Sequence, residues 1–258
     1  MRHDQMIDFH THMLPAIDDG SRSIEESLAI FKQQQEEGVK ALVATPHFYP
    51  DDQLEAFLQK RDLAEEKLKQ SLQMAGLFEQ VQFKKGAEVL LSVDTWQIKD
   101  LQALCITGTK YILLEMPYSV WSDWVYTSVQ SIIDHHGLIP IIAHVERYDT
   151  VMDQPNQLLR FIEMGAILQM NTYSLQKGSS KYKIAHKLLK HHMIHILGSD
   201  VHRAKGLVSV KEGYRDIEQQ FGHTYVEQML QIAKAIYEGE EVSYEAPTPF
   251  KKRFGRWF

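Results

Sequence analysis

Histidine and acidic residues recur along this chain of 258 residues in short clusters whose spacing suits metal binding. His10 and His12 are two positions apart, and so are Asp200 and His202. Because residues two apart on an extended strand point to the same face, each pair can close on one ion. Imidazole and carboxylate ligands suit zinc, manganese or iron, while the lack of thiolate ligands argues against a structural zinc site.

The clusters stand where predicted strands end. Six of seven predicted strands finish in a histidine or a carboxylate, and an acidic turn follows the first strand. These residues are His10 and His12, His47, Glu88, Glu115, His144 and Glu146, Asp200 and His202, with Asp18 and Asp19 in the turn. Each is common by itself in proteins that bind no metal. Their coincidence at equivalent positions predicts one metal-dependent active site.

Strand-like and helix-like segments alternate along the chain. The predicted strands are 6–10, 40–45, 81–90, 111–115, 138–143, 166–170 and 194–198, and the predicted helices are 23–38, 52–74, 95–104, 121–136, 156–164, 182–192 and 224–237. Alternation favours parallel strands, because right-handed crossovers carry each helix over the sheet. A closed barrel and an open doubly wound sheet both fit, and in both the active site lies at the carboxyl ends of the strands.

Composition narrows the class of protein. The length suits a single α/β barrel, and 44% hydrophobic residues can supply a core. The net charge of −6 argues against nucleic acid as a partner. The sequence shows neither a membrane-spanning apolar run nor a signal peptide, and its one cysteine, Cys105, excludes an internal disulfide. We therefore expect a cytoplasmic protein.

Other chemistries lack their motifs. A cysteine phosphatase needs Cys-x5-Arg, but Tyr111 stands six residues after Cys105, which we expect to be inert core. Neither Gly-x-Ser-x-Gly nor a glycine-rich nucleotide loop occurs. Other histidines are expected outside the site: His3 in a polar extension, His195 in a metal-like triplet at the opposite rim, and His135, His136, His186, His191, His192 and His223 in or beside helices.

The combined motifs resemble the polymerase and histidinol phosphatase (PHP) superfamily. They are IDFHTH at 7–12, HMLPAIDDG at 12–20, ATPH at 44–47, GAE at 86–88, LEMP at 114–117, AHVER at 143–147 and GSDVH at 198–202. Within it, the chain is most similar to the manganese-dependent protein-tyrosine phosphatases that bacteria encode with capsule or exopolysaccharide genes. Those enzymes are the partners of bacterial tyrosine kinases, so the resemblance implies a membrane-associated kinase as partner.

The resemblance also implies a fold and a set of metal ligands. The fold would be a distorted seven-stranded (β/α) barrel over residues 1–246, followed by a tail at 247–258. Up to three ions, most naturally Mn²⁺ but also Fe or Zn, would be bound. The first would take His10, His12, Glu88 and Asp200; the second Glu88 as a bridge with Glu115 and His144; the third Asp19, His47 and His202.

The implied reaction is phosphomonoester hydrolysis. Arg147, three residues past His144, is predicted to bind the phosphate, since a guanidinium matches phosphate oxygens bidentately. The alternative for Arg147 is a surface salt bridge with Glu146. Arg203 is a weaker second candidate for the phosphate. No acid for the leaving group is obvious, and Asp18 and Glu146 are the candidates.

Three alternatives stay open at this stage. The same site could act on histidinol phosphate, another small phosphomonoester or a nucleic-acid 3′ end, although the acidic body disfavours nucleic acid. A PHP domain used only as a binding module should have lost ligands, and this chain has lost none. An amidohydrolase barrel also opens with His-x-His, but Glu115 stands where its carboxylated lysine would be.

The tail interleaves cations with aromatic residues. Pro247 and Pro249 are expected to stop the preceding helix. The cations are Lys251, Lys252, Arg253 and Arg256, and the aromatic residues are Phe250, Phe254, Trp257 and Phe258. Either the aromatic rings pack back on the barrel, or the tail makes a peripheral membrane contact through its charges and rings.

Overall fold

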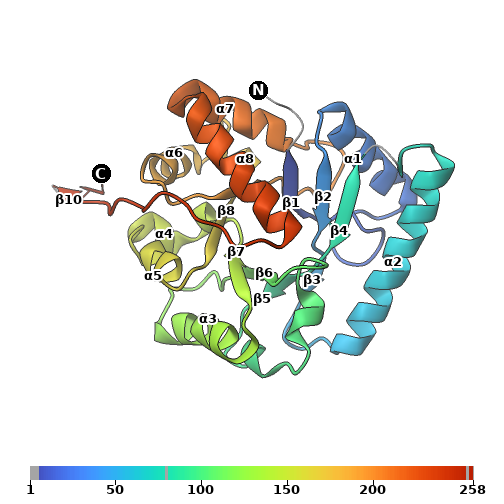
Figure 1. The fold of residues 1–258 in the computed structure, drawn as a ribbon, viewed down its shortest axis with the longest axis horizontal. Coiled ribbons are helices and arrows are strands. Elements are labelled where there is room, and N and C mark those ends of the chain that lie inside the picture. The colour runs from blue at the N-terminus through green and yellow to red at the C-terminus, as the bar shows by residue number, and fades with distance from the viewer. Residues whose placement is uncertain (1–5, 79–80, 254–255, 258) are drawn as a thin grey trace.

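The structure, a computed structural model, describes residues 6–78, 81–253 and 256–257. Parallel strands form its centre and helices surround them (Figure 1). None of the helices in these ranges combines the length and the apolar content that a membrane span requires. The prediction for His3 falls on residues outside the described ranges, and so do the predictions for Phe254 and Phe258.

The strands form two parallel sheets that curl around one interior. One sheet has the order β1–β2–β4 and the other the order β3–β5–β6–β7–β8–β9. The strands are β1 (Ile7–Thr11), β2 (Ala41–Ala44), β3 (His47–Phe48), β4 (Gln82–Lys85), β5 (Glu88–Leu90), β6 (Tyr111–Glu115), β7 (Ile139–Ile142), β8 (Ile167–Asn171) and β9 (Ile196–Gly198). A bridge between Thr11 and Val201 brings the first strand beside the segment that follows the last.

The predicted count of seven strands in one barrel is not confirmed. Six strands form the curled sheet and three form the other, because one expected strand is split in two and a further short strand follows another. The predicted strand 81–90 is split into β4 and β5, and β2 is followed after a break by β3. Pro46 lies in that break and has no N–H to donate to a ladder. The pairs Ala44–Lys85 and His47–Glu88 nevertheless keep the same register across the break.

The helices cover the outside of the sheets. They are α1 (Ile24–Glu36), α2 (Leu54–Met74), α3 (Asp123–His136), α4 (Asp149–Asp153), α5 (Gln157–Glu163), α6 (Tyr182–Lys190), α7 (Val210–Phe221) and α8 (His223–Glu238), with 3₁₀ turns η3 (Thr95–Gln97), η4 (Leu101–Leu104), η5 (Val145–Arg147) and η6 (Thr172–Leu175). The Ser23 hydroxyl accepts the Glu26 N–H, as its capping signal predicts. The segment 95–104, predicted as one helix, forms two 3₁₀ turns.

Helix α7 is absent from the sequence prediction. Its N-cap is Ser209, whose side chain accepts the Glu212 N–H. Ser209 and Glu212 have the spacing of a capping box, so a local signal was present. Gly222 then separates α7 from α8.

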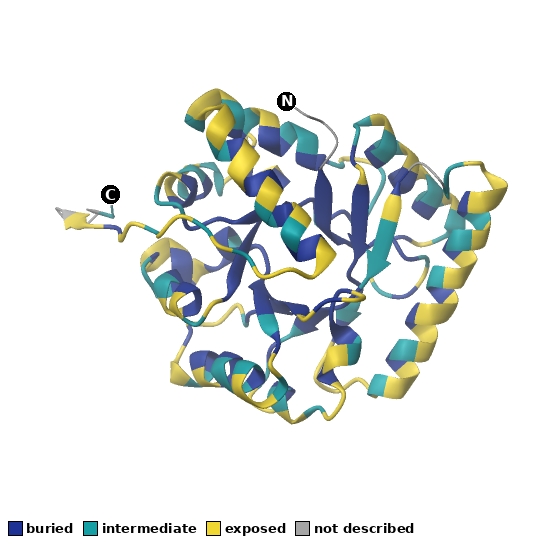
Figure 2. Ribbon diagram, in the orientation of Figure 1, coloured by how far each residue is buried: buried dark blue, intermediate teal, exposed yellow. Residues whose placement is uncertain are grey.

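Two apolar clusters account for the core. The inner one takes alternate residues of the strands, such as Ile7 and Phe9 of β1 and Leu113 of β6, and is closed by Ala233 and Ile236 of α8. The larger one lies between the strands and the outer helices. Figure 2 shows most of the strands buried, with the edge strand β4 partly exposed, and the outward faces of the helices exposed. Helix α8 therefore closes one end of the sheets, and the other end is left for polar side chains.

Candidate metal centre

All nine predicted metal ligands lie together at the carboxyl ends of the strands. They fall into four groups whose ligand atoms are within 4.8 Å of one another. The groups are His10, His12 and Asp200; His10, Glu88 and His144; His47, Glu88 and Glu115; and His12, Asp19, His47 and His202. The ends of different strands and the loops that follow them thus converge on one site, as the alternation of strands and helices predicts.

A bulge in β1 turns its two histidines toward this point. Ile7 and Phe9 face the inner core, so strict alternation would turn His10 outward, alongside Asp8. Asp8 pairs with Leu42, but Thr11 pairs with Ala44, so β1 gains one residue over β2 between the two pairs. A one-residue bulge reverses the facing of the residues that follow it. His10 and His12 consequently both face the cluster.

Glu88 lies at the centre of the cluster and is 1% exposed. Its Oε2 is 3.0 Å from His10 Nε2, 3.2 Å from His12 Nε2 and 3.1 Å from His47 Nδ1. Its Oε1 is 2.8 Å from His144 Nε2. Burial opposes ionisation, but the facing imidazoles, His10 above all, hold the pKa of Glu88 well below its ordinary value. Glu88 is therefore a carboxylate that four imidazoles share.

The outer nitrogens of three imidazoles are already engaged. His10 Nδ1 is 3.2 Å from Gln169 Oε1, and His12 Nδ1 is 2.8 Å from Asp18 Oδ2. His202 Nδ1 is 2.9 Å from the backbone oxygen of Asp200. These acceptors place the proton on Nδ1, which leaves the Nε2 lone pair free to bind a metal.

The residues fit divalent transition-metal ions. With those tautomers, the Nε2 atoms of His10 and His12 are two lone pairs only 3.0 Å apart, an arrangement that a shared cation relieves. Burial and the neighbouring Glu88 carboxylate raise the pKa of Glu115, which a cation between the two would reverse. Mixed imidazole and carboxylate donors suit manganese, iron and zinc alike.

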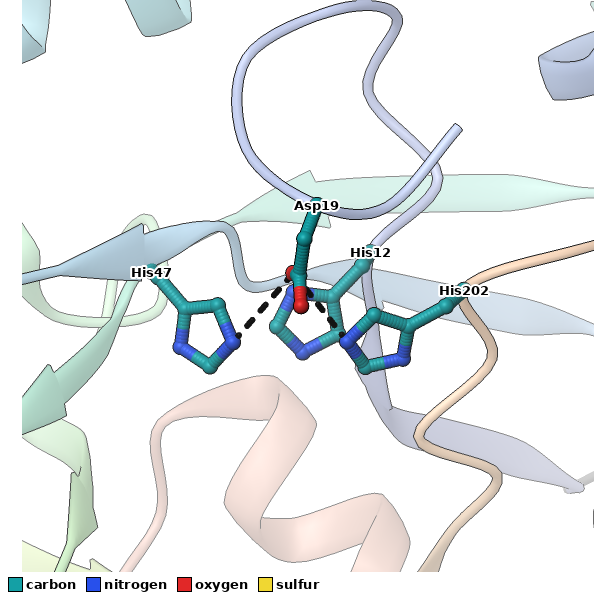
Figure 3. Close-up of side chains that lie close together, drawn as sticks. All are labelled: His12, Asp19, His47 and His202. Carbon is teal, nitrogen blue, oxygen red and sulfur yellow. Dashed lines mark ion pairs between the residues drawn. The ribbon is translucent and has the colours of Figure 1, made fainter. Parts of the chain in front are cut away.

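The group nearest the surface includes Asp19, and Figure 3 shows its carboxylate between His47 and His202. Asp19 Oδ1 is 3.5 Å from His47 Nε2 and 3.3 Å from His202 Nε2. The rings of His12 and His202 stack with centroids 4.1 Å apart. Because Asp19 is largely exposed whereas Glu88 is buried, the cluster runs from the interior to the solvent.

The backbone is strained or crowded at several of these positions. His144 and Asp200 have positive φ angles of 31° and 55°, which residues other than glycine rarely adopt. A Cβ on Gly198 would lie 2.6 Å from the Cβ of His10, so only glycine lets β9 approach β1 here. Strain of this kind is typical of functional sites.

Arg147 lies beside the cluster, and its Nη1 is 2.8 Å from Asp200 Oδ2. The alternative pairing with Glu146 is wrong, because Glu146 is fully buried and accepts bonds from Ser174 and from the Asn171 N–H. Arg203 is the poorer candidate for phosphate, since its Nη1 donates to the backbone oxygens of Gly20 and His202.

Neither candidate acid is suited to that role. Asp18 is buried, but its bonds to His12 and to the N–H groups of Gly20 and His47 lower its pKa to about 2. A group with that pKa is ionised at neutral pH and cannot donate a proton. Burial raises the pKa of Glu146, but its hydrogen bonds run to η6 and β8 and not to the cluster.

The remaining titratable residues of the sequence prediction lie away from the cluster. His191 stacks on Phe250 of the tail, and His192 forms an ion pair with Glu245. His195 is buried, which lowers its pKa to about 3. Cys105 is buried as expected, and burial raises the pKa of its thiol to about 12.

Strand β8 supplies two residues that the sequence prediction missed. Gln169 Oε1 accepts the His144 backbone N–H as well as contacting His10, and Gln169 Nε2 donates to Asn171 Oδ1. Asn171 Nδ2 in turn donates to Asp200 Oδ2. The signal was a pair of polar residues two apart at the end of an apolar strand, the spacing that marked the histidine pairs.

Comparison with known proteins places this geometry in a family. Residues 6–246 match the model of the capsular polysaccharide synthesis family CpsB/CapC. This chain belongs to that family. Curated relatives include the tyrosine-protein phosphatases CpsB of Streptococcus pneumoniae and YwqE of Bacillus subtilis. CpsB is 28% identical over 76% of this chain and 83% of its own length; YwqE is 27% identical over 96% and 98%.

A solved structure of the same family agrees with the fold. It comes from work on YwqE and CpsB, which are described there as unique metal-dependent tyrosine phosphatases. It matches with a TM-score of 0.85 and 25% identity, and covers 96% of this chain and 100% of its own. The putative phosphatase CapC of Staphylococcus aureus is 27% identical over 98% of this chain and 99% of its own length. The resemblance to these phosphatases is therefore confirmed.

Proposed function

We propose that this chain is a metal-dependent protein-tyrosine phosphatase that acts in capsule or exopolysaccharide synthesis. The observation that carries the proposal is the convergence of nine imidazole and carboxylate side chains on the buried Glu88. The named activities of its relatives, which cover nearly the whole chain, support the same reaction. The full ligand set also favours an enzyme over a binding module.

The proposed sites combine members of the four groups, as the family resemblance suggests. His10, His12, Glu88 and Asp200 would hold one ion; Glu88, Glu115 and His144 a second; Asp19, His47 and His202 a third. Manganese is our first choice, with iron or zinc as alternatives that the donors also accept. Divalent ions of this kind, when bound, lower the pKa of a water and neutralise charge on the phosphate.

Arg147 is the proposed phosphate-binding side chain. Its guanidinium carries five N–H donors, and the structure assigns one bond, from Nη1 to Asp200. That bond orients the guanidinium toward the cluster. Lys181 Nζ donates to the backbone oxygen of Arg147 at 3.1 Å, which holds the backbone at this position. The side chain is 41% exposed, so an incoming phosphate can reach its remaining donors.

A metal-replacement assay tests the function. The protein is stripped with a chelator, and hydrolysis of a phosphotyrosine peptide and of histidinol phosphate is measured after Mn²⁺, Fe²⁺ or Zn²⁺ is added back. We expect activity to vanish on stripping, to return best with Mn²⁺ and to favour the peptide. Activity that survives stripping, or a preference for histidinol phosphate, would contradict the proposal.

The proposed substrate is a phosphotyrosine protein, such as a membrane-associated tyrosine kinase, and the tail offers a means of reaching it. Phe250 is 3% exposed, and its ring stacks on that of His191 with the centroids 3.8 Å apart. Asn156 Nδ2 donates to the Phe250 backbone oxygen, and the Phe250 N–H donates to Asn156 Oδ1. The packing interpretation therefore holds for Phe250, and also for Trp257, which packs against the larger core cluster and donates its Nε1–H to the backbone oxygen of Asp153. Beyond Phe250 lies a short hairpin of β10 (Lys252–Arg253) and β11 (Arg256–Trp257), which Figure 1 places at the edge of the molecule.

We propose that the hairpin contacts an anionic membrane. Lys251 and Lys252 are exposed, and each basic residue near such a surface contributes about 1 kcal/mol. Deletion of 251–258 should leave peptide hydrolysis nearly unchanged but reduce co-sedimentation with phosphatidylserine vesicles. Deletion of 250–258 should also lower the melting temperature, because it removes Phe250. Undiminished co-sedimentation without 251–258 would refute the membrane contact.

A further inference from the structure

Three exposed tyrosines border the metal centre. Among the described residues, the large aromatic side chains that are mostly open to solvent are Tyr49, Tyr118 and Tyr173, at 45%, 51% and 57% exposure. Tyr49 follows His47 by two residues, Tyr118 lies just after β6, and Tyr173 lines a pocket beside Asp200. Exposed aromatic rings scattered over a surface need no explanation, but rings gathered around one polar site indicate a ligand with an apolar part.

Tyr49 is held on the side of the cluster that His47 occupies. Its ring lies 5.4 Å from the His47 ring, at an interplanar angle of 25°. The Tyr49 N–H donates to Asp52 Oδ2 at 2.7 Å, which secures the turn that carries the ring. Tyr49 therefore stands over one edge of the centre with the rest of its ring exposed.

Tyr118 is held beside another histidine of the cluster, His144. Its ring is 6.4 Å from the ring of His144 and 5.3 Å from that of Tyr148. The Arg147 guanidinium carbon lies 5.6 Å from the centre of the Tyr118 ring, within the range of a cation–π contact. Tyr148 is itself fixed, because its hydroxyl accepts the Met116 N–H at 2.8 Å. The ring of Tyr118 is thus supported beside the proposed phosphate-binding arginine.

Both rings border the same space. Tyr49 stacks against His47 and Tyr118 against His144, and these two imidazoles contact the same carboxylate, Glu88, at 3.1 Å and 2.8 Å. The two rings therefore flank the same part of the cluster. A phosphate bound between Arg147 and the cluster would direct its ester group outward, past these two rings.

We propose that Tyr49 and Tyr118 are specificity-determining residues that hold the aromatic ring of an aryl phosphate ester. This inference rests on the proposed function and adds to it the reason for aryl selectivity. Aromatic pairs stabilise each other beyond simple burial, by amounts that correspond to about a two- to tenfold effect per ring. An alkyl phosphate would reach the same metal groups but gain nothing from the two tyrosines.

The competing explanation is that each tyrosine only shields a histidine of the cluster. Removing a shield would change metal content or weaken every phosphate ligand alike. Removing an aryl-binding ring would weaken aryl ligands selectively. Tyr→Phe substitutions separate the ring from the hydroxyl, which matters at Tyr118 because its hydroxyl also bonds the Glu115 carboxylate.

The experiment compares two stable phosphonates. Phenylphosphonate and methylphosphonate are titrated into the Mn²⁺-loaded protein by calorimetry, for wild type, Tyr49→Ala, Tyr118→Ala and both Phe variants. Val120→Ala is the matched control, since Val120 is exposed two residues from Tyr118 on the same loop. We expect each Ala variant to lose about two- to tenfold in phenylphosphonate affinity, with methylphosphonate affinity and metal content unchanged. The Phe variants and Val120→Ala should match wild type.

Two results would overturn the inference. Equal losses for both phosphonates would show shielding, and Tyr118→Phe behaving like Tyr118→Ala would assign the effect to the hydroxyl. Wild-type hydrolysis of phosphotyrosine peptide is measured in parallel. If wild type hydrolyses the peptide but the phosphonate preference does not change in the Ala variants, only this inference fails; if wild type hydrolyses nothing, the proposed function fails first.

Discussion

Substitution of Glu88 is the sharpest test of the metal centre. Glu88→Gln keeps the shape of the side chain but removes the charge that four imidazole nitrogens surround at 2.8–3.2 Å. Because Glu88 belongs to two of the four ligand groups, its loss should disturb more than one proposed ion. We expect hydrolysis of phosphotyrosine peptide to fall by at least about 10²-fold, equivalent to about 2.7 kcal/mol of transition-state stabilisation.

Metal binding should also raise the thermal stability of the protein, which gives a second measurable effect. An ion present at about 100 times its dissociation constant stabilises the folded state by about 2.7 kcal/mol. For a domain of this size, that corresponds to a rise of roughly 5–10 °C in melting temperature. Wild type should show this rise when Mn²⁺ is added to the stripped protein, and Glu88→Gln should lose most of it.

The assay pairs peptide hydrolysis with metal analysis and thermal melts. Glu65→Gln is the matched control, because it removes a carboxylate that pairs with Lys69 and Lys85, away from the cluster. The control should keep full activity and the full Mn²⁺ response. Wild-type activity of Glu88→Gln at normal metal content would refute the assignment of Glu88 and, with it, the centre built around it.

Three further predictions test the surroundings of Glu88. Arg147→Ala should keep its metal but lose about 10- to 100-fold in kcat/KM, with partial recovery in Arg147→Lys; unchanged peptide kinetics would exclude phosphate binding by Arg147. Gln169→Leu should weaken Mn²⁺ affinity about 10- to 100-fold, because His10 loses its outer partner; an unchanged calorimetric affinity would contradict that role. His195 has a folded pKa of about 3, below the unfolded value, so the unfolded state alone gains its proton as pH falls through about 6.5. Stability should therefore decrease from pH 6.5 to pH 5 by about 2 kcal/mol more in wild type than in His195→Asn, and equal pH dependence in denaturant melts would disprove it.

The ligand types and the strand ends that carry them could be predicted from the sequence. His10 with His12, and Asp200 with His202, are local patterns of ligand residues. Alternating strands and helices place the carboxyl ends of the strands at one rim, whether or not the sheet closes into a barrel. All nine predicted ligands accordingly lie within ligand-sharing distance. Helix α7 is absent from the prediction although its capping signal is local, because Gly213, a poor helix former, stands on its buried face near its start.

The facing of the side chains was decided by the tertiary structure. The bulge in β1 is a mismatch of register with β2, so no pattern within β1 alone reveals it. The roles of Asp18 and Gln169 likewise depend on residues far away in sequence, since Asp18 accepts the His47 N–H and Gln169 contacts His10. The sequence shows only that Asp18 carries a carboxyl group. In the folded protein three hydrogen bonds keep that group ionised, so Asp18 orients His12 and does not act as an acid.

Local chemistry determined which groups this protein could offer to a metal, because residue type and strand period are properties of short segments. For His10, His12 and His202, packing determined which ring nitrogen faces inward, because that choice is made by the acceptor behind the ring. It also brought Tyr49 and Tyr118, which are distant in sequence, beside two histidines of one site. Such pairings depend on the closure of the two sheets, whose contacts join segments as distant as Thr11 and Val201.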